Sequence, residues 1–185
     1  MSVLLSLWLP ILASAVFVFI VSTIIHMMLP WHKGDFRKLP NEDQVLEALR
    51  PFAIPRGDYM VPRAGGMDEM KTPEFKAKLQ RGPVFSATFT DCEMAIGKSL
   101  VQWFVYLLVI SYFAAYVGAH AVALSPITIA HSRRLIGITA FLGYGGALCQ
   151  GSIWYKRSWG TTIRSLIDSA IYGGVTALTF EWLWR

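Results

Sequence analysis

The chain has 185 residues, of which 54% are hydrophobic and 16% are charged, and its mean hydropathy is +0.44. Such a composition lies outside the range of ordinary soluble domains and indicates a membrane protein. Lys and Arg outnumber Asp and Glu by 17 to 12, but ten residues of each kind share the segment 31–97, so no basic patch supports nucleic-acid binding.

The first 32 residues contain no Asp, Glu, Lys or Arg. A hydrocarbon core about 30 Å thick is crossed by roughly 20 apolar residues in a helix. We therefore expect the first transmembrane helix within residues 1–30, running Ile11–Leu29 between Pro10 and Pro30. The segment begins without basic residues, which argues against a cleaved secretory signal.

The polar segment 31–97 contains local signals for two short helices and two short strands. These signals are N-cap residues, prolines at helix starts and ends, and clusters of β-forming residues. They predict a helix capped by Asn41 and ended by Pro51, a helix from Thr72-Pro73 to near Gly82, and strands at Gly57–Val61 and Val84–Phe89. We expect a small α/β cap on the cytoplasmic side.

Three further apolar runs predict transmembrane helices at 98–122, 134–155 and 161–183. The fold class is therefore an all-α integral membrane protein, with four transmembrane helices and the α/β cap between helices 1 and 2. Its parts are residues 1–30 as the first helix, 31–97 as the polar segment and 98–185 as a three-helix transmembrane bundle.

Small residues recur every four positions on the last three helices, which lets helix backbones approach closely in lipid. The rows are Ser111, Ala115 and Ala119; Thr139, Gly143, Ala147 and Gly151; and Ser169, Gly173 and Ala177. We interpret them as packing faces, within the chain or toward other membrane-protein subunits.

The basic residues predict the orientation of the chain in the membrane. If residues 31–97 are cytoplasmic, that side has fourteen Lys and Arg residues, against three on the other side, namely Arg133, Arg134 and Arg185. This bias follows the positive-inside rule. It places both termini outside a plasma or inner membrane.

Several motifs are too weak to define a function. Gly97-Lys98-Ser99 lacks the earlier glycine of a phosphate-binding loop, because position 92 is Cys92. Gly143-Tyr144-Gly145 resembles a potassium-channel filter but lies in a run long enough to be one helix. The two cysteines, Cys92 and Cys149, are expected to be free thiols on the reducing side.

Ionisable residues inside the membrane are the strongest pointers to function, because burial there is costly. Asp168 lies inside the last helix, and Arg164 precedes it by four residues, so we expect these two to form an ion pair. Side chains at similar depth on neighbouring helices complete a candidate binding site: His26, Lys98, Gln102 and Gln150. The alternative is an ion pair near the headgroups with no functional role.

No catalytic constellation, cofactor motif or metal-ligand spacing is present in the sequence. The leading hypothesis is a non-enzymatic accessory, scaffold or assembly subunit of a membrane complex, with a cytoplasmic partner at 31–97. The alternative is a small transporter or channel subunit centred on Asp168. A third hypothesis is a haem or metal redox protein that uses His120 and His131.

Overall fold

The computed structural model describes residues 6–91, 95–124 and 129–184. The chain divides into two compact units. The helical unit comprises Met1–Arg37 and Ala95–Arg185, and the inserted unit comprises Lys38–Met94. The elements are mostly helices, with one small sheet.

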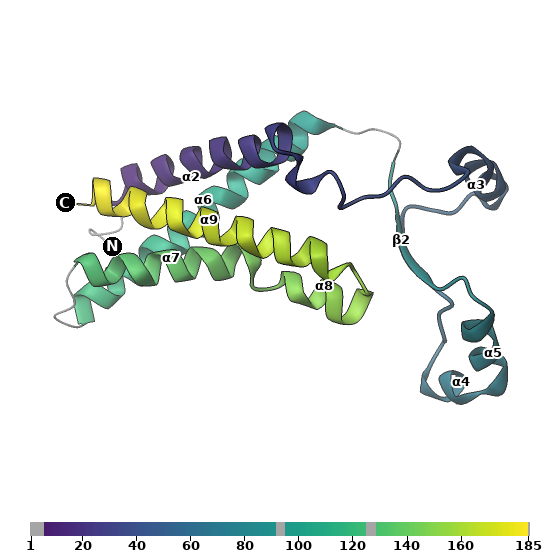
Figure 1. The fold of residues 1–185 in the computed structure, drawn as a ribbon. Helices are drawn as coiled ribbons and strands as arrows, with labels where there is room; N and C mark the ends of the chain where they lie inside the picture. Colours follow the sequence, from purple (N-terminus) through teal and green to yellow (C-terminus); the bar gives the residue numbers. More distant parts are fainter. Residues whose placement is uncertain (1–5, 92–94, 125–128, 185) are drawn as a thin grey trace. The chain divides into compact units, whose positions relative to one another are not determined.

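The described residues of the helical unit form four long α-helices and a short one (Figure 1). They are α2 (Trp8–Thr23), α6 (Ile96–Leu124), α7 (Ile129–Gly145), α8 (Leu148–Tyr155) and α9 (Trp159–Leu183). Helix α2 contacts α6 and α9, and α7 contacts the same two helices, so the long helices pack in a closed circuit. Their buried side chains are mainly small or apolar: Ala15, Val18, Leu107, Ala115, Ile136, Ala140 and Phe180.

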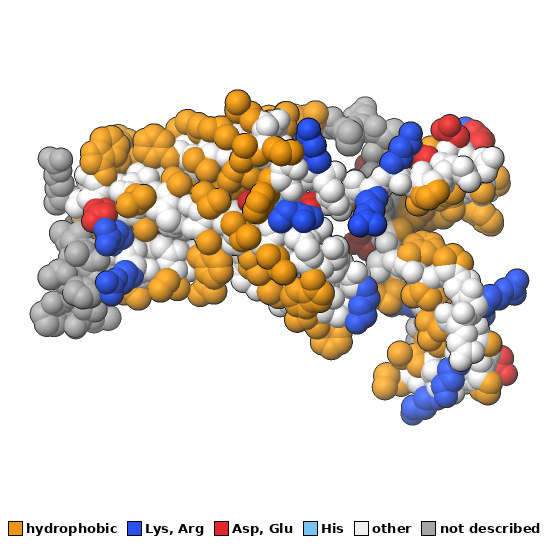
Figure 2. All heavy atoms as spheres, viewed as in Figure 1, with side chains coloured by type: hydrophobic (Ala, Val, Ile, Leu, Met, Phe, Trp, Pro, Cys, Tyr) orange, Lys and Arg blue, Asp and Glu red, His pale blue; other side chains and the backbone are white. Residues whose placement is uncertain are grey.

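Within the described residues, three segments are long and apolar enough to cross a membrane: Trp8–Met28, Ile96–Ala123 and Ser132–Tyr155. Hydrophobic side chains are spread along the visible face of these helices (Figure 2). The chain is therefore an integral membrane protein by the length and composition of its helices. Helix α9 is not among the three, because its apolar residues alternate with Ser, Thr, Gly and three charged residues.

Most helix boundaries differ from the prediction by a few residues, and two differences have a clear physical cause. Helix α2 begins at Trp8, before Pro10, because a proline is tolerated in the first turn of a helix. The single helix predicted at 134–155 is divided, since α7 ends at Gly145 and α8 begins at Leu148. At the break, a Cβ on Gly146 would lie 2.7 Å from the Leu142 carbonyl oxygen, so this backbone geometry requires glycine.

The residues Gly143-Tyr144-Gly145 are helical and belong to α7. A filter loop at this place is therefore excluded. Gly143 faces Ile110 of α6, since a Cβ there would lie 2.7 Å from the Ile110 Cδ1 atom.

The small residues of α9 pack against α7 within the same chain. A Cβ on Gly173 would lie 2.7 Å from the Gly137 carbonyl oxygen, and a Cβ on Gly145 would lie 2.8 Å from the Ser169 hydroxyl. The α7 residues at this contact are Gly137 and Gly145. Neither belongs to the predicted row of small residues that contains Gly143. Close approach of the two backbones explains why glycine stands on both helices.

The inserted unit contains the two helices and two strands that the sequence predicts for this segment, and one further short α-helix. They are α3 (Glu42–Leu49), β1 (Gly57–Val61), α4 (Met67–Lys71), α5 (Pro73–Arg81) and β2 (Phe85–Phe89). The strands are antiparallel, with Gly57 opposite Phe89. Thr72 caps α5 as expected, because its hydroxyl accepts a hydrogen bond from the Phe75 amide at 3.2 Å. Asn41 precedes α3 but makes no side-chain cap bond, and α4 was not predicted.

Candidate functional site: a histidine and aspartate cluster

The site begins where α2 ends. Pro30 restricts the residue before it, and Leu29 is accordingly extended at φ −88° and ψ 145°. The last turn before this break, Ile24–Met28, is a π-helix, a form of helix that is frequent at functional sites. His26 lies in that turn, with its Nδ1 atom 3.0 Å from the Ser22 carbonyl oxygen. The following 3₁₀ turn, Pro30–His32, contacts α9.

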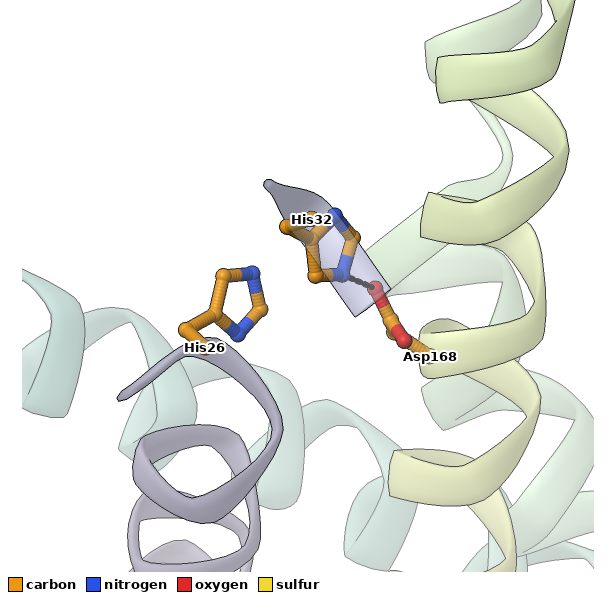
Figure 3. A group of neighbouring side chains, drawn as sticks. All are labelled: His26, His32 and Asp168. Carbon is orange, nitrogen blue, oxygen red and sulfur yellow. Dashed lines mark hydrogen bonds and ion pairs between the residues drawn. The ribbon is translucent and has the colours of Figure 1, made fainter. Parts of the chain in front are cut away.

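His32 joins two carboxylates. Its Nδ1 atom lies 2.6 Å from Asp35 Oδ2, and its Nε2 atom lies 2.8 Å from Asp168 Oδ2. The three side chains are 13%, 8% and 5% exposed, in the order His32, Asp35, Asp168. Ionised carboxylates only accept hydrogen bonds, so both bonds form when the ring carries hydrogen on both nitrogens. His32 lies between His26 and Asp168 (Figure 3).

Arg164 completes a balanced set of charges. Its Nε atom donates to Asp35 Oδ1 at 2.9 Å, and its Nη2 atom contacts the same oxygen. The predicted ion pair between Arg164 and Asp168 is therefore wrong, because Arg164 binds Asp35 while Asp168 binds His32. With a protonated His32, the cluster contains two positive and two negative groups, which lowers the cost of burying each of them.

The pKa of Asp35 is lowered from its ordinary value of 3.8. Burial raises this pKa, but hydrogen bonds from His32 and Arg164, together with their positive charges, lower it further than burial raises it. A lowered pKa in the folded state means that the ionised carboxylate stabilises the fold. That stabilisation is complete above the unfolded pKa and is lost as the pH falls through the folded pKa.

Replacing Asp35 by asparagine is therefore expected to lower the free energy of unfolding near neutral pH. The difference between wild type and Asp35→Asn should shrink as the pH falls from 3.8 through the lower pKa of the folded state, because the unfolded carboxyl is protonated first and the folded carboxyl at a lower pH. Unfolding in mild detergent at a series of pH values measures this difference. An equal difference at neutral pH and well below pH 3.8 would contradict the assignment.

His26, His32 and Asp168 each offer one metal-ligand atom, and these atoms lie within 4.8 Å of one another. The imidazole rings of His26 and His32 are stacked, with centroids 4.4 Å apart and planes inclined by 6°. A metal binds in the plane of an imidazole ring, and two parallel stacked planes share no such point. Both nitrogens of His32 also face carboxylates. In this conformation the three residues fit a hydrogen-bonded cluster better than a metal centre.

A cavity of about 600 Å³ lies beside the cluster. Its lining includes His26 and Asp168, together with the aromatic rings of Trp103, Tyr144 and Tyr172. Three buried oxygen atoms among these residues, Tyr144 Oη, Asp168 Oδ1 and Tyr172 Oη, have no hydrogen-bond partner within the described part of the chain. Unsatisfied buried polar atoms are rare and call for an explanation.

The structure brings together only some of the predicted site residues. His26 and Asp168 lie in one group, and Arg164 joins them through Asp35. Lys98, Gln102 and Gln150 are exposed and do not line the cavity.

Sequence reasoning missed His32 and Asp35 as members of the site. The available signal was their position directly after Pro30, with Asp35 the first acidic residue in the chain. A proline at the end of a transmembrane helix turns the chain, and residues after it can return to a neighbouring helix.

The remaining charged residue of α9, two further histidines and the two cysteines are described separately from this cluster. Glu181 pairs with Arg133, and the His120 ring contacts the Tyr116 carbonyl oxygen of its own helix at 2.9 Å. The side chain of His131 lies outside the described residues, so a pair of His120 and His131 stays a prediction. Cys149 is a free cysteine, as expected, and Cys92 lies outside the described residues.

Comparisons with protein-family models, curated proteins and solved structures give no match to this chain.

Proposed function

We propose that this protein is a small membrane transport or channel subunit that moves protons through a site centred on Asp168. The observation that carries the proposal is the hydrogen bond of 2.8 Å between His32 Nε2 and Asp168 Oδ2, which joins a partly buried histidine to a buried aspartate. Imidazole and carboxyl groups are the usual members of proton relays in membrane helices. Histidine in particular changes its charge near physiological pH.

The arrangement supports proton transfer in two ways. Asp168 is one turn deeper in α9 than Arg164, so its carboxylate is held inside the unit rather than paired to the nearest cation. His32 belongs to the turn that follows α2, outside the apolar segment Trp8–Met28. The hydrogen bond between them thus joins a group within the packed helices to a group beyond a transmembrane segment.

We also propose that α9 is a fourth crossing. It has 25 residues, which is long enough to span a bilayer. Each of its charged residues has a polar partner: Arg164 pairs with the carboxylate of Asp35, Asp168 is hydrogen-bonded to the His32 ring, and Glu181 pairs with Arg133. Pairing reduces the cost of placing these charges in a membrane helix. The positive-inside rule favours residues 31–97 in the cytoplasm and both termini outside a plasma or inner membrane.

Proton flux into liposomes that contain the purified protein tests the proposal. A potassium gradient with valinomycin supplies the driving force, and a trapped dye reports the internal pH. We expect the wild type to conduct protons and Asp168→Asn to fall to the leak rate of empty liposomes, because the amide cannot exchange a proton. Glu181→Gln is the matched control, since Glu181 is an exposed acid on the same helix, and it should conduct like the wild type.

Two outcomes would contradict the proposal. One is a wild-type flux equal to that of empty liposomes, and the other is an unchanged flux in Asp168→Asn. Size-exclusion chromatography and far-UV circular dichroism of each variant establish that a lost flux is not a lost fold.

An accessory or assembly role is the second candidate, and the inserted unit favours it. Phe75 is its one buried side chain within the described residues, while Phe52, Met67 and Val84 are 73%, 71% and 58% exposed. Apolar side chains that are exposed to solvent in this way are frequent at protein–protein interfaces. A photo-crosslinking residue at Phe52 should then trap one protein of defined mass in native membranes, and a residue at Lys76 should not. Equal products at both positions would contradict this role.

A further inference from the structure

The cavity beside the cluster combines an aromatic lining with one buried acid. Trp103 and Tyr172 have ring centroids 6.4 Å apart, and Tyr144 and Tyr172 have centroids 5.6 Å apart. The Trp103 Nε1 atom donates to Ser22 Oγ at 3.1 Å, which fixes the indole against α2. Asp168 is buried and is the one acidic residue among the described residues that line the cavity. Aromatic faces and a carboxylate both attract cations.

The hydrogen bonds of Asp168 are incomplete. Oδ2 accepts from His32, whereas Oδ1 has no partner within the described residues. Tyr172 follows Asp168 by one turn on α9, and its hydroxyl is likewise buried without a partner there. A carboxylate oxygen requires a hydrogen-bond donor, and a phenol can donate or accept. A ligand that carries N–H donors on a positive charge satisfies both atoms.

We propose that this cavity binds a protonated organic amine, with the ammonium group at Asp168 and the apolar body against Trp103, Tyr144 and Tyr172. The proposal rests on the proposed transport function and names its substrate class. The volume of about 600 Å³ accommodates an amine with a bulky apolar body. The negative charge of Asp168 repels an anion. A neutral ligand of the same shape cannot form the charge-assisted hydrogen bond to this carboxylate.

Binding of the cation is coupled to release of one proton. The groups that face His32 are Asp35, Asp168 and the stacked ring of His26, and Arg164 faces Asp35. With a protonated His32 these charges balance, so an added ammonium leaves one positive charge in excess. The N–H bond at His32 Nε2 then breaks, its electron pair stays on the nitrogen, and the proton passes to water. The ammonium replaces Nε2–H as the donor to Asp168.

Binding of two matched compounds tests the proposal: 2-naphthylmethylamine and 2-naphthylmethanol. They differ in charge but have nearly the same shape. With the wild type in phosphatidylcholine nanodiscs, we expect the amine to bind about tenfold or more tightly than the alcohol, as a hydrogen bond to a charged group implies. Titration in two buffers of different ionisation enthalpy should show about one proton released for each amine bound.

In Asp168→Asn the preference for the amine should disappear while alcohol binding remains, which also shows that the cavity is still folded. Trp103→Leu should weaken the binding of both compounds, and Glu181→Gln should leave both affinities unchanged. Equal binding of amine and alcohol by the wild type would overturn the proposal, and so would a preference that survives in Asp168→Asn.

The two proposals fail in distinguishable ways. Proton flux that depends on Asp168, without amine preference, leaves the transport function standing and removes the substrate class. Amine preference without proton flux leaves a binding site and removes transport.

Discussion

Replacing His32 by leucine is expected to lower the free energy of unfolding by about 3 kcal/mol. The change removes the donor to both Asp35 Oδ2 and Asp168 Oδ2, which lie 2.6 Å and 2.8 Å from the ring nitrogens. Losing one partner of a buried ion pair leaves an uncompensated charge and costs about 3–5 kcal/mol. Arg164 still neutralises Asp35, so we expect the lower end of this range.

Reversible unfolding in mixed detergent micelles measures this loss. The matched control is His120→Leu. His120 is exposed, and its ring contacts the carbonyl oxygen and the ring of Tyr116, which belongs to the same helix. That variant should lie within about 0.5 kcal/mol of the wild type. The double variant His32→Leu/Asp168→Leu should recover part of the loss, since no charge is then left unpaired at α9. Strictly additive losses in the double variant would contradict the pairing.

The second large effect is expected at the contact between α7 and α9. Gly173→Leu should destabilise the helical unit by about 3 kcal/mol, because inserted carbon atoms force packed backbones apart. A Cβ at this position would lie 2.7 Å from the Gly137 carbonyl oxygen and 3.2 Å from the Phe141 amide nitrogen. Both are backbone atoms, so a side-chain rotation cannot relieve the clash.

Gly174→Leu is the control for this prediction. Gly174 is the next residue of the same helix, and a Cβ there meets nothing within 4 Å. The substitution should be neutral or stabilise the helix by up to about 1 kcal/mol, since glycine is the weaker helix former. The same unfolding assay separates the two variants. Equal stability of Gly173→Leu and Gly174→Leu would show that α7 and α9 do not pack as described.

The sequence predicts local elements well where one residue type decides the outcome. Thr72 followed by Pro73 predicts the start of α5, and β1 appears at the predicted residues Gly57–Val61. Three transmembrane segments follow from uninterrupted apolar length alone. In each case the signal lies within the element itself.

Features that depend on three-dimensional neighbours were not predicted. The spacing of Arg164 and Asp168 favours an ion pair along one helix face. In the structure, however, Asp168 is hydrogen-bonded to His32, and Arg164 is hydrogen-bonded to Asp35. Which partner is chosen depends on where the turn after Pro30 places residues 32–35, and helix periodicity contains no information on that turn. The break at Gly146 was hidden for a related reason, since an isolated glycine is also compatible with a continuous helix.

The central claim is that His32 and Asp168 share a hydrogen bond inside the helical unit. Nitrogen-15 NMR of the histidine side chains in nanodiscs tests it most directly, with the four histidines assigned by single substitution. We expect the His32 Nε2 signal to show a strong hydrogen bond in the wild type, to shift in Asp168→Asn and to be unchanged in Glu181→Gln. A His32 signal that resembles exposed His120 and is indifferent to Asp168→Asn would contradict the account.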